Sequence, residues 1–291
     1  MAGSITDRIS LFERQDALGC WRVATCTPSP ALAPFVLSYW FGEGQVFYQR
    51  DRILPGGTSF LLINLGPTQY RILPGPPEQR VPFRDIWYSG MHEGPIETEA
   101  PHGNALLGVV FQSAGARGVL HVDAQALANQ IQPLEDLLGS SVLALRERLL
   151  QMSDCRARFA ELEHWLLCRL RSQHAPHRLV SWAVANLQRS AGQGSVERLA
   201  AEAGVSRKYL GNLFQRDVGL SPKMLARVLR FQSALSLLAW RDTVPWVALA
   251  EHCGYYDQSH LTRDFQAFSG YAPGAFVRQA RPDGQSVVVA G

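Results

Sequence analysis

An internal repeat near the C-terminal end is the feature that most constrains how this 291-residue chain can fold. Residues 196–222 and 246–273 share eight identities, and self-similarity of this kind marks one supersecondary unit used twice. The first three identities are spaced by 50 residues and, after one inserted residue, the other five by 51: Leu199/Leu249, Ala200/Ala250, Gly204/Gly254, Leu210/Leu261, Phe214/Phe265, Gln215/Gln266, Gly219/Gly270 and Pro222/Pro273.

Each copy is predicted to form two short helices joined by a tight turn. Gly204 and Gly254 supply the positive φ with which such a turn begins, and Ser206 and Asp257 are placed to cap the second helix. That helix carries an apolar stripe at helical spacing, formed by Leu210, Leu213 and Phe214 in the first copy and by Leu261, Phe265 and Phe268 in the second. This is the helix-turn-helix arrangement, whose second helix is free to enter the major groove of DNA.

The face opposite the apolar stripe is polar in both copies. Because the stripe holds the helix to its own domain, these polar groups are left toward solvent and suit base edges and phosphates. A solvated helix face would explain either copy alone, but it does not explain two copies with the same architecture. The predicted DNA-binding residues are Arg207, Lys208, Gly211, Asn212 and Gln215 in the first copy and Gln258, Ser259, Thr262 and Arg263 in the second.

Residues 221–240, between the copies, are predicted to form one helix with Ser221 as its cap and Pro222 at its first helical position. About twenty helical residues span roughly 30 Å, which is comparable to the ~34 Å of one DNA turn. A rigid connection of that length would let one subunit contact two adjacent segments of the major groove.

Residues 179–281 resemble the AraC/XylS family of transcription regulators. The signature of the family's second motif is present as Gly254, Tyr255, Asp257, Ser259, His260, Arg263, Phe265, Gly270, Pro273 and Phe276. Three positions depart from it, with Leu261 for the usual Phe, Gln266 for the usual basic residue and Ala272 for the usual Ser or Thr, which removes a cap. The resemblance implies DNA contacts at Lys208, Gly211, Asn212, Gln258, Ser259, Thr262 and Arg263. Gly211 has no side chain for a base, so close backbone approach or a lost contact is expected there.

The first 130 residues contain short apolar runs bounded by Gly, Pro and Asn. The runs over residues 34–44, 59–67, 84–94 and 104–115 predict strands of a sandwich or barrel. From Pro133 onward the spacing becomes helical, and residues 133–152 and 155–173 predict two helices. Residues 52–66, 108–120 and 131–139 resemble a β-rich domain that precedes the DNA-binding module in a poorly characterised branch of the same family. Such domains are usually taken as barrel-like sensors that bind an effector or dimerise.

The predicted fold class is therefore α+β, with three parts. A cupin-like β-barrel sensor domain with flanking helices is expected over residues 1–175, an all-α double helix-turn-helix domain over 176–281, and a flexible tail over 282–291, with residues 173–178 as linker. Charge follows this division, because residues 1–175 hold 15 basic and 17 acidic residues, net −2, whereas residues 176–281 hold 13 and 7, net +6. A local basic excess suits a polyanionic partner.

Composition is that of a globular protein, with 46% hydrophobic and 18% charged residues. No apolar run approaches the roughly 20 residues of a membrane helix, and the N-terminus lacks a signal-peptide pattern. The five cysteines form no CxxC pair, so neither a disulfide framework nor a zinc cluster is expected. We expect a bacterial, cytoplasmic protein without a membrane partner.

An enzymatic N-terminal domain is the main alternative. Cupin-type metal sites need a His-x-His pair and further donors on adjoining strands, whereas His92 and His102 are ten residues apart and His121 stands alone. No GxSxG or GxxxxGK[ST] motif occurs. We therefore expect no catalytic residue, metal or cofactor, with a cupin-like enzyme or metal-binding barrel fused to a DNA-binding module as the alternative. A DNA-bending protein without sequence preference agrees less well with the unequal polar sets of the two helices.

Double-stranded DNA is the predicted partner, and a small-molecule effector, RNA polymerase and a second copy of the chain are further candidates. Trp40, Tyr48, Trp87 and Tyr88 are candidates for lining an effector site, although aromatic residues on strands more often belong to a core. Trp165 and Leu167 lie off the apolar stripe of the helix over 155–171, so either a dimer contact or packing on the chain's own barrel is expected there.

Overall fold

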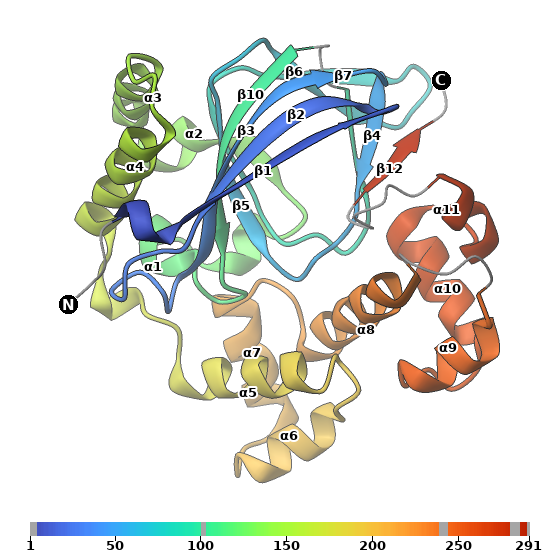
Figure 1. Cartoon of the computed structure of the whole chain (residues 1–291). Coiled ribbons are helices and arrows are strands. Elements are labelled where there is room, and N and C mark those ends of the chain that lie inside the picture. The colour runs from blue at the N-terminus through green and yellow to red at the C-terminus, as the bar shows by residue number, and fades with distance from the viewer. Residues whose placement is uncertain (1–4, 100–102, 239–243, 280–285, 290–291) are drawn as a thin grey trace.

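The computed structural model describes residues 5–99, 103–238, 244–279 and 286–289. Figure 1 shows a β-barrel built from the N-terminal part of the chain, with α3 and α4 beside it and the helices from α5 onward below and to one side. The α+β class predicted from the sequence is confirmed.

Two antiparallel sheets form the barrel. The order in the seven-stranded sheet is β1 (Ile9–Asp16), β2 (Gly19–Cys26), β3 (Val36–Val46), β10 (Gly103–Phe111), β5 (Ser59–Asn64), β8 (Ile86–Ser89) and β11 (Ile131–Pro133). The order in the five-stranded sheet is β12 (Ser286–Val289), β4 (Arg50–Ile53), β9 (Ile96–Glu99), β6 (Gln69–Leu73) and β7 (Gln79–Phe83). The four predicted apolar runs are β3, β5, β8 and β10.

The apolar runs lack a simple alternation because the larger sheet is covered on both faces. In β5, Leu61 and Ile63 pack into a core shared with helix α4, while Phe60 and Leu62 point to the other side and line a cavity inside the barrel. Leu61 and Ile63 are therefore fully buried, and Phe60 and Leu62 are half-buried.

Short helices connect and flank the strands: η1 (Ile5–Arg8), α1 (Arg117–Leu120), η2 (Ala124–Leu127), α2 (Leu134–Leu138), η3 (Ser140–Val142), α3 (Leu143–Leu150), α4 (Cys155–Arg169) and η4 (Ser172–His174). The prediction of one helix over 133–152 is wrong, because Gly139, at φ 80° and ψ 166°, interrupts it between α2 and η3. The second predicted helix is α4, which buries Phe159, Leu162 and Leu166.

The remaining helices are α5 (Arg178–Arg189), α6 (Val196–Glu202), α7 (Arg207–Asp217), α8 (Pro222–Leu238), α9 (Trp246–His252), α10 (Gln258–Ser269) and α11 (Pro273–Gln279). The 17 residues of α8 span about 25 Å, and the last two residues of the helix predicted over 221–240 lie outside the described ranges. Helix α11 forms despite Ala272, whose carbonyl accepts bonds from the amides of Ala275 and Phe276. Within the described ranges, no helix combines the length and the hydropathy that crossing a bilayer requires.

The predicted flexible tail over 282–291 is wrong for its central part. Residues Ser286–Val289 form β12, which pairs with β4 of the barrel, and Val287 is buried. The rest of that predicted range lies outside the described residues. A strand that follows the helical domain in sequence is thus part of the barrel's smaller sheet.

The helical domain is docked on the barrel rather than separated from it. Leu54 of the barrel packs in the core of the second helix-turn-helix, and Met91 and Ala114 pack in the core of the first. The side-chain amide of Gln232, on α8, donates to the carbonyl of Pro55 at 2.7 Å. The barrel therefore contacts both motifs and the helix between them.

Candidate nucleic-acid interface

Helices α6 and α7 form the first helix-turn-helix. Gly204, in the turn, has φ +64°, and the amide of Val205 donates to the carbonyl of Ala200 at 3.0 Å. The hydroxyl of Ser206 then accepts from the amide of Tyr209, so this residue caps α7 as predicted.

Helices α9 and α10 repeat this geometry. Gly254 has φ +73°, and the amide of Tyr255 donates to the carbonyl of Ala250 at 2.9 Å. The carboxylate of Asp257 accepts from the amide of His260 at 2.7 Å. The two copies therefore share their turn and their cap as well as their sequence pattern.

The apolar stripes anchor both second helices. Leu210, Leu213 and Phe214 are buried in the core of the first motif, and Leu261, Phe265 and Phe268 in the core of the second. Phe265 also makes edge contacts with Phe231 of α8 and Phe276 of α11. The orientation of α10 about its own axis is thus set by aromatic packing on two neighbouring helices.

The predicted DNA-binding residues all lie on the sides of α7 and α10 that are not buried. Arg207, Lys208, Asn212, Gln258, Ser259 and Arg263 are exposed, and Gly211, Gln215 and Thr262 are half-exposed. Apart from the backbone of α7 itself, a Cβ atom added to Gly211 would have no heavy atom within 4 Å, so α7 faces open space there. Such a surface can approach a nucleic-acid backbone closely.

Two of these residues have contacts that DNA would compete with. Arg207 forms an ion pair with Glu197 of α6 at 3.1 Å, and the Nε of Arg263 donates to the carbonyl of Ser259 at 3.4 Å. Arg207 and Glu197 are both well exposed, so their pair is weak and its exchange for a phosphate costs little.

A buried ion pair fixes α10 on α8. Arg227 donates to the carboxylate of Asp264 at 2.7 Å, and Asp264 is 2% exposed. The guanidinium also lies over the ring of Phe268, 5.1 Å from its centre. The sequence pattern did not predict this ion pair, because Arg227 and Asp264 are separated by 37 residues.

Tyr256 is a surface residue that the sequence analysis did not single out. It immediately precedes the cap Asp257, and its side chain is 93% exposed, whereas the neighbouring Tyr255 is buried. Tyr256 is also the inserted residue of the second copy, because nothing in the first copy corresponds to it between Val205 and the cap Ser206. This insertion was a signal that could have identified it.

The C-terminal end of α7 abuts the barrel. Gly219, just beyond α7, has φ +86°, and a Cβ there would come within 2.7 Å of the carbonyl oxygen of Ala124 in η2. The carboxylate of Asp217 accepts from the amide of His177 in the linker and lies 3.9 Å from Arg117 of α1. Since this contact involves only the far end, the polar N-terminal half of α7 stays exposed to solvent.

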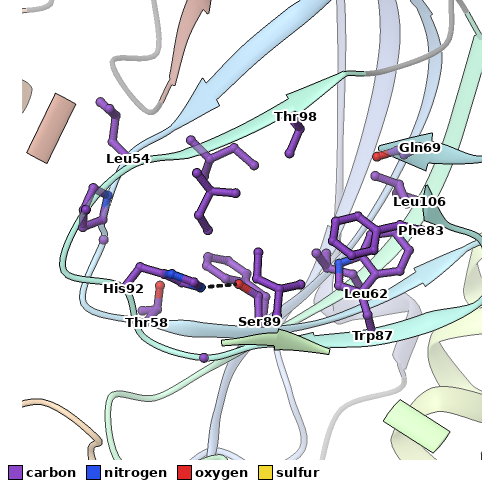
Figure 2. Close-up of a pocket in the computed structure, with 18 of the residues that line it drawn as sticks. Leu54, Thr58, Leu62, Gln69, Phe83, Trp87, Ser89, His92, Thr98 and Leu106 are labelled. Atoms are coloured by element: carbon purple, nitrogen blue, oxygen red, sulfur yellow. Dashed lines mark hydrogen bonds between the residues drawn. The ribbon is translucent and has the colours of Figure 1, made fainter. Parts of the chain in front are cut away.

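A cavity of about 230 Å³ lies inside the barrel, between the two sheets. Its walls are mainly apolar and aromatic, and Figure 2 shows Phe83 and Trp87 toward one side and His92 with Ser89 toward another. The Oγ of Ser89 and the Nε2 of His92 are 3.2 Å apart. Burial, helped by the charge of Arg71, lowers the pKa of His92 to about 4, so its imidazole is neutral at pH 7.

Of the four aromatic residues considered for an effector site, Trp40 and Trp87 line this cavity, while Tyr88 packs in the core on the other side of the sheet. Tyr48 is not among the lining residues. His92 was considered only as a metal ligand and was missed as a lining residue. In the described part of the chain, no three His, Cys, Asp or Glu side chains are grouped so as to hold a metal ion, and His102 lies outside that part.

Comparison with known families divides the chain in the same way. Residues 199–279 match a helix-turn-helix domain family, and residues 24–133 match a domain family of unknown function, DUF6597.

Two curated relatives match about a third of the chain. The RCS-specific HTH-type transcriptional activator RclR of Escherichia coli is 35% identical over 91 residues, which is 30% of this chain and 32% of that protein. An HTH-type transcriptional regulator of Haemophilus influenzae is 29% identical over 99 residues, which is 34% of this chain and 33% of that protein. The chain thus spans about a third of the length of these curated relatives.

Among solved structures, ToxT from Vibrio cholerae O395 aligns over 79% of this chain and 95% of its own, with 11% identity and a TM-score of 0.42. The duplicated turn-and-cap geometry of α6–α7 and α9–α10 agrees with the family match and with the names of the curated relatives. The chain therefore joins a DUF6597 domain to a C-terminal helix-turn-helix domain of the AraC type.

Proposed function

We propose that this protein is a sequence-specific transcription regulator that binds double-stranded DNA through α7 and α10. The observation that carries the proposal is the duplicated motif, in which each second helix buries an apolar stripe and exposes a polar face. Its DNA contacts are assigned to Arg207, Lys208, Gly211, Asn212, Gln215, Gln258, Ser259, Thr262 and Arg263. Tyr256, fully exposed beside the start of α10, is an additional candidate.

Helix α8 would set the separation of the two contacts. It is a continuous helix that packs against both motifs, and the Arg227–Asp264 pair ties it to α10. A rod of about 25 Å between the motifs is of the order of one turn of DNA, so adjacent major-groove segments on one side of the duplex are the expected target.

Residues 1–175, extended by β12, are assigned a sensing role rather than a catalytic one. The cavity supports a small effector, because its apolar wall includes Leu54 and Pro55, which also contact the helical domain. A ligand that moves this wall would act on the position of α8. Residues 176–281 are assigned to DNA binding. A transcription regulator would have RNA polymerase as a partner and would act in the cytoplasm.

We also propose a homodimer that forms through the exposed face of α4. Trp165 packs against the barrel's own core, which agrees with the second of the two expectations for this residue, packing on the chain's own barrel. Leu167 remains 40% exposed on α4, and a second copy would cover it. Sedimentation of the full chain with and without Leu167→Glu measures this directly.

The proposal is tested on the full chain, because Leu54 and Val287 belong to the core of the second motif and an isolated 176–281 segment would lack both. Genomic fragments retained by the protein define an operator, and fluorescence anisotropy then measures affinity for it. Affinity is expected to fall steeply with salt through counterion release.

Arg263→Ala is expected to weaken operator binding about 5- to 150-fold, since one good base contact is worth about 1–3 kcal/mol. Arg156→Ala is the matched control, because Arg156 is also an exposed arginine and lies on α4 of the barrel domain. Equal binding of the operator and of unrelated duplexes would instead favour a DNA-bending protein, and unchanged binding by the Arg263 variant would remove its assigned role.

A further inference from the structure

The cavity in the barrel has an uncharged lining. Among the lining residues that the structure describes there is no Asp, Glu, Lys or Arg, and the polar ones are Thr58, Gln69, Ser89, His92 and Thr98. Because His92 is neutral at pH 7, a charged group that contacts a ligand must belong to a residue next to the lining residues.

Arg71 lies next to that lining on β6. It is paired with Thr98 of β9 and is two residues from Gln69, so strand alternation places all three on the face toward the cavity. The influence of its charge on His92 agrees with this placement. Burial also lowers the pKa of Arg71 itself, which means that its guanidinium has lost water without gaining a carboxylate.

The other arginines of the smaller sheet are paired. Arg50 forms ion pairs with Glu78 and Glu97, Arg52 with Glu97, and Arg80 with Glu99, on the face turned away from the cavity. Within the ranges described, Arg71 has neither an ion pair nor a hydrogen bond. The nearest acidic residue on the same face of the sheet is Asp51. Thr98 lies between the two, so the Cα atoms of Asp51 and Arg71 are two strand spacings, or roughly 10 Å, apart.

A second donor beside Arg71 also lacks an acceptor. The side-chain nitrogen of Gln69 is buried and has no hydrogen-bond partner, and Gln69 lines the cavity. Unmatched buried donors are rare in folded proteins, and a frequent reason is a ligand that supplies the acceptor. The unmatched amide of Gln69 and the half-buried, unpaired guanidinium of Arg71 lie on neighbouring inward positions of one strand, and together they define one acceptor site.

We propose that the cavity binds a small organic acid with an apolar body, whose carboxylate is held by Arg71 and Gln69. A guanidinium and an amide can together satisfy both oxygens of a carboxylate. A phosphate, with its second charge, would call for further cations, and the lining offers none. The volume of about 230 Å³ exceeds the roughly 150 Å³ cavity that admits benzene, so the body is of the size of a phenylalkyl or medium-chain alkyl group.

This inference rests on the sensing role proposed for the barrel and names the class of its effector. The same cavity wall includes Gly94, whose added Cβ would lie 3.9 Å from the carbonyl oxygen of Ala267 in α10, as well as Leu54 and Pro55. A bound acid would thus contact the surface on which α8 and α10 rest.

The test compares acids with alcohols of the same body on the full chain. Binding of 3-phenylpropanoate, octanoate, 3-phenylpropan-1-ol and octan-1-ol is measured by calorimetry and by the fluorescence of Trp40 and Trp87, which line the cavity. At least one acid is expected to bind ten-fold or more tightly than its alcohol. Equal affinity of each acid and its alcohol, or no binding by either acid, would overturn the proposal without any variant.

Arg71→Gln is expected to abolish the preference for acid, while Arg71→Lys keeps part of it. Arg80→Gln is the matched control, because Arg80 lies on the opposite face of the same sheet and should leave the preference unchanged. An acid preference that survives in a folded Arg71→Gln protein would overturn the site. Operator binding, measured separately, distinguishes the two proposals. Acid binding that depends on Arg71, without any DNA binding, would contradict the regulator. Operator binding without an acid preference that depends on Arg71 would contradict the acid site.

Discussion

The guanidinium of Arg52, in β4 of the barrel, donates a hydrogen bond of 3.1 Å to the carbonyl of Ser269, the last residue of α10. The same guanidinium lies 4.7 Å from the ring centre of Tyr271 and forms an ion pair with Glu97. Strand β12 pairs with β4 as well, so β4 contacts both the end of α10 and the segment that follows α11. A change in the barrel has a direct route to α10 through this strand.

Arg52→Ala is expected to weaken the contact between β4 and the end of α10 without unfolding the barrel. The variant loses a charge-assisted bond and an aromatic contact, together worth about 1 kcal/mol or somewhat more at a half-buried site. Amide hydrogen exchange should therefore rise about five-fold or more in α11 and β12. Arg80→Ala removes a comparable contact over Tyr70 on the same sheet and should leave both segments protected; equal exchange in the two variants would disprove the coupling.

The helix-turn-helix domain could be predicted because its signals are local. Gly204, Ser206 and the apolar stripe of α7 lie within a few residues of one another, and the second copy repeats them. A local signal was also overlooked, since Gly139 occurs in the middle of a predicted helix and interrupts it.

Trp40 and Trp87 were predicted as candidates for lining an effector site, and they line the cavity. The polar side of the cavity and the docking of the helical domain could not be predicted, because both depend on the register of distant strands. Arg71 and Thr98 become neighbours through strand pairing across 27 positions, and β12 pairs with a strand more than 230 residues earlier. No periodicity in the chain carries that information. The isolation of Arg71 is visible only after the arginines of the same sheet have been assigned to their partners.

Asp264→Asn tests the ion pair that fixes α10 on α8. Removing the charge leaves Arg227, which is 28% exposed, without its carboxylate, so a loss of about 1–3 kcal/mol in unfolding free energy is expected. Urea denaturation followed by circular dichroism measures it. The surface pair Arg198–Glu202 is the control, and Glu202→Gln should cost less than about 0.5 kcal/mol. Similar losses in the two variants would mean that the Asp264 pair does no more than a solvent-exposed one.

Gly211→Ala is expected to separate stability from DNA binding. The new methyl group meets no atom outside the backbone of α7 within 4 Å and replaces a helix-interior glycine, so unfolding free energy should rise by about 0.5–1 kcal/mol. Operator affinity should fall, because the methyl group would stand between α7 and the DNA. Gly274→Ala in α11, where a Cβ also meets open space, should leave operator affinity unchanged. An unchanged affinity in the Gly211 variant would show that the backbone of α7 does not come close to DNA.

His92 should make the barrel less stable in mild acid. The unfolded chain protonates this imidazole near pH 6.5, whereas in the folded barrel burial, with the charge of Arg71, lowers its pKa to about 4. The unfolded state therefore binds more protons between these values, and stability falls as the pH drops from about 6.5 to about 4.

The shift corresponds to about 2 kcal/mol after allowance for partial exposure of the ring. Urea midpoints at pH 7.5 and pH 5 should differ less in His92→Gln than in the unaltered protein, because the substituted amide does not titrate. His164→Gln, at an exposed site on α4, should keep the original difference. If all three proteins lost the same stability between the two pH values, the imidazole in the cavity would not be the group that titrates.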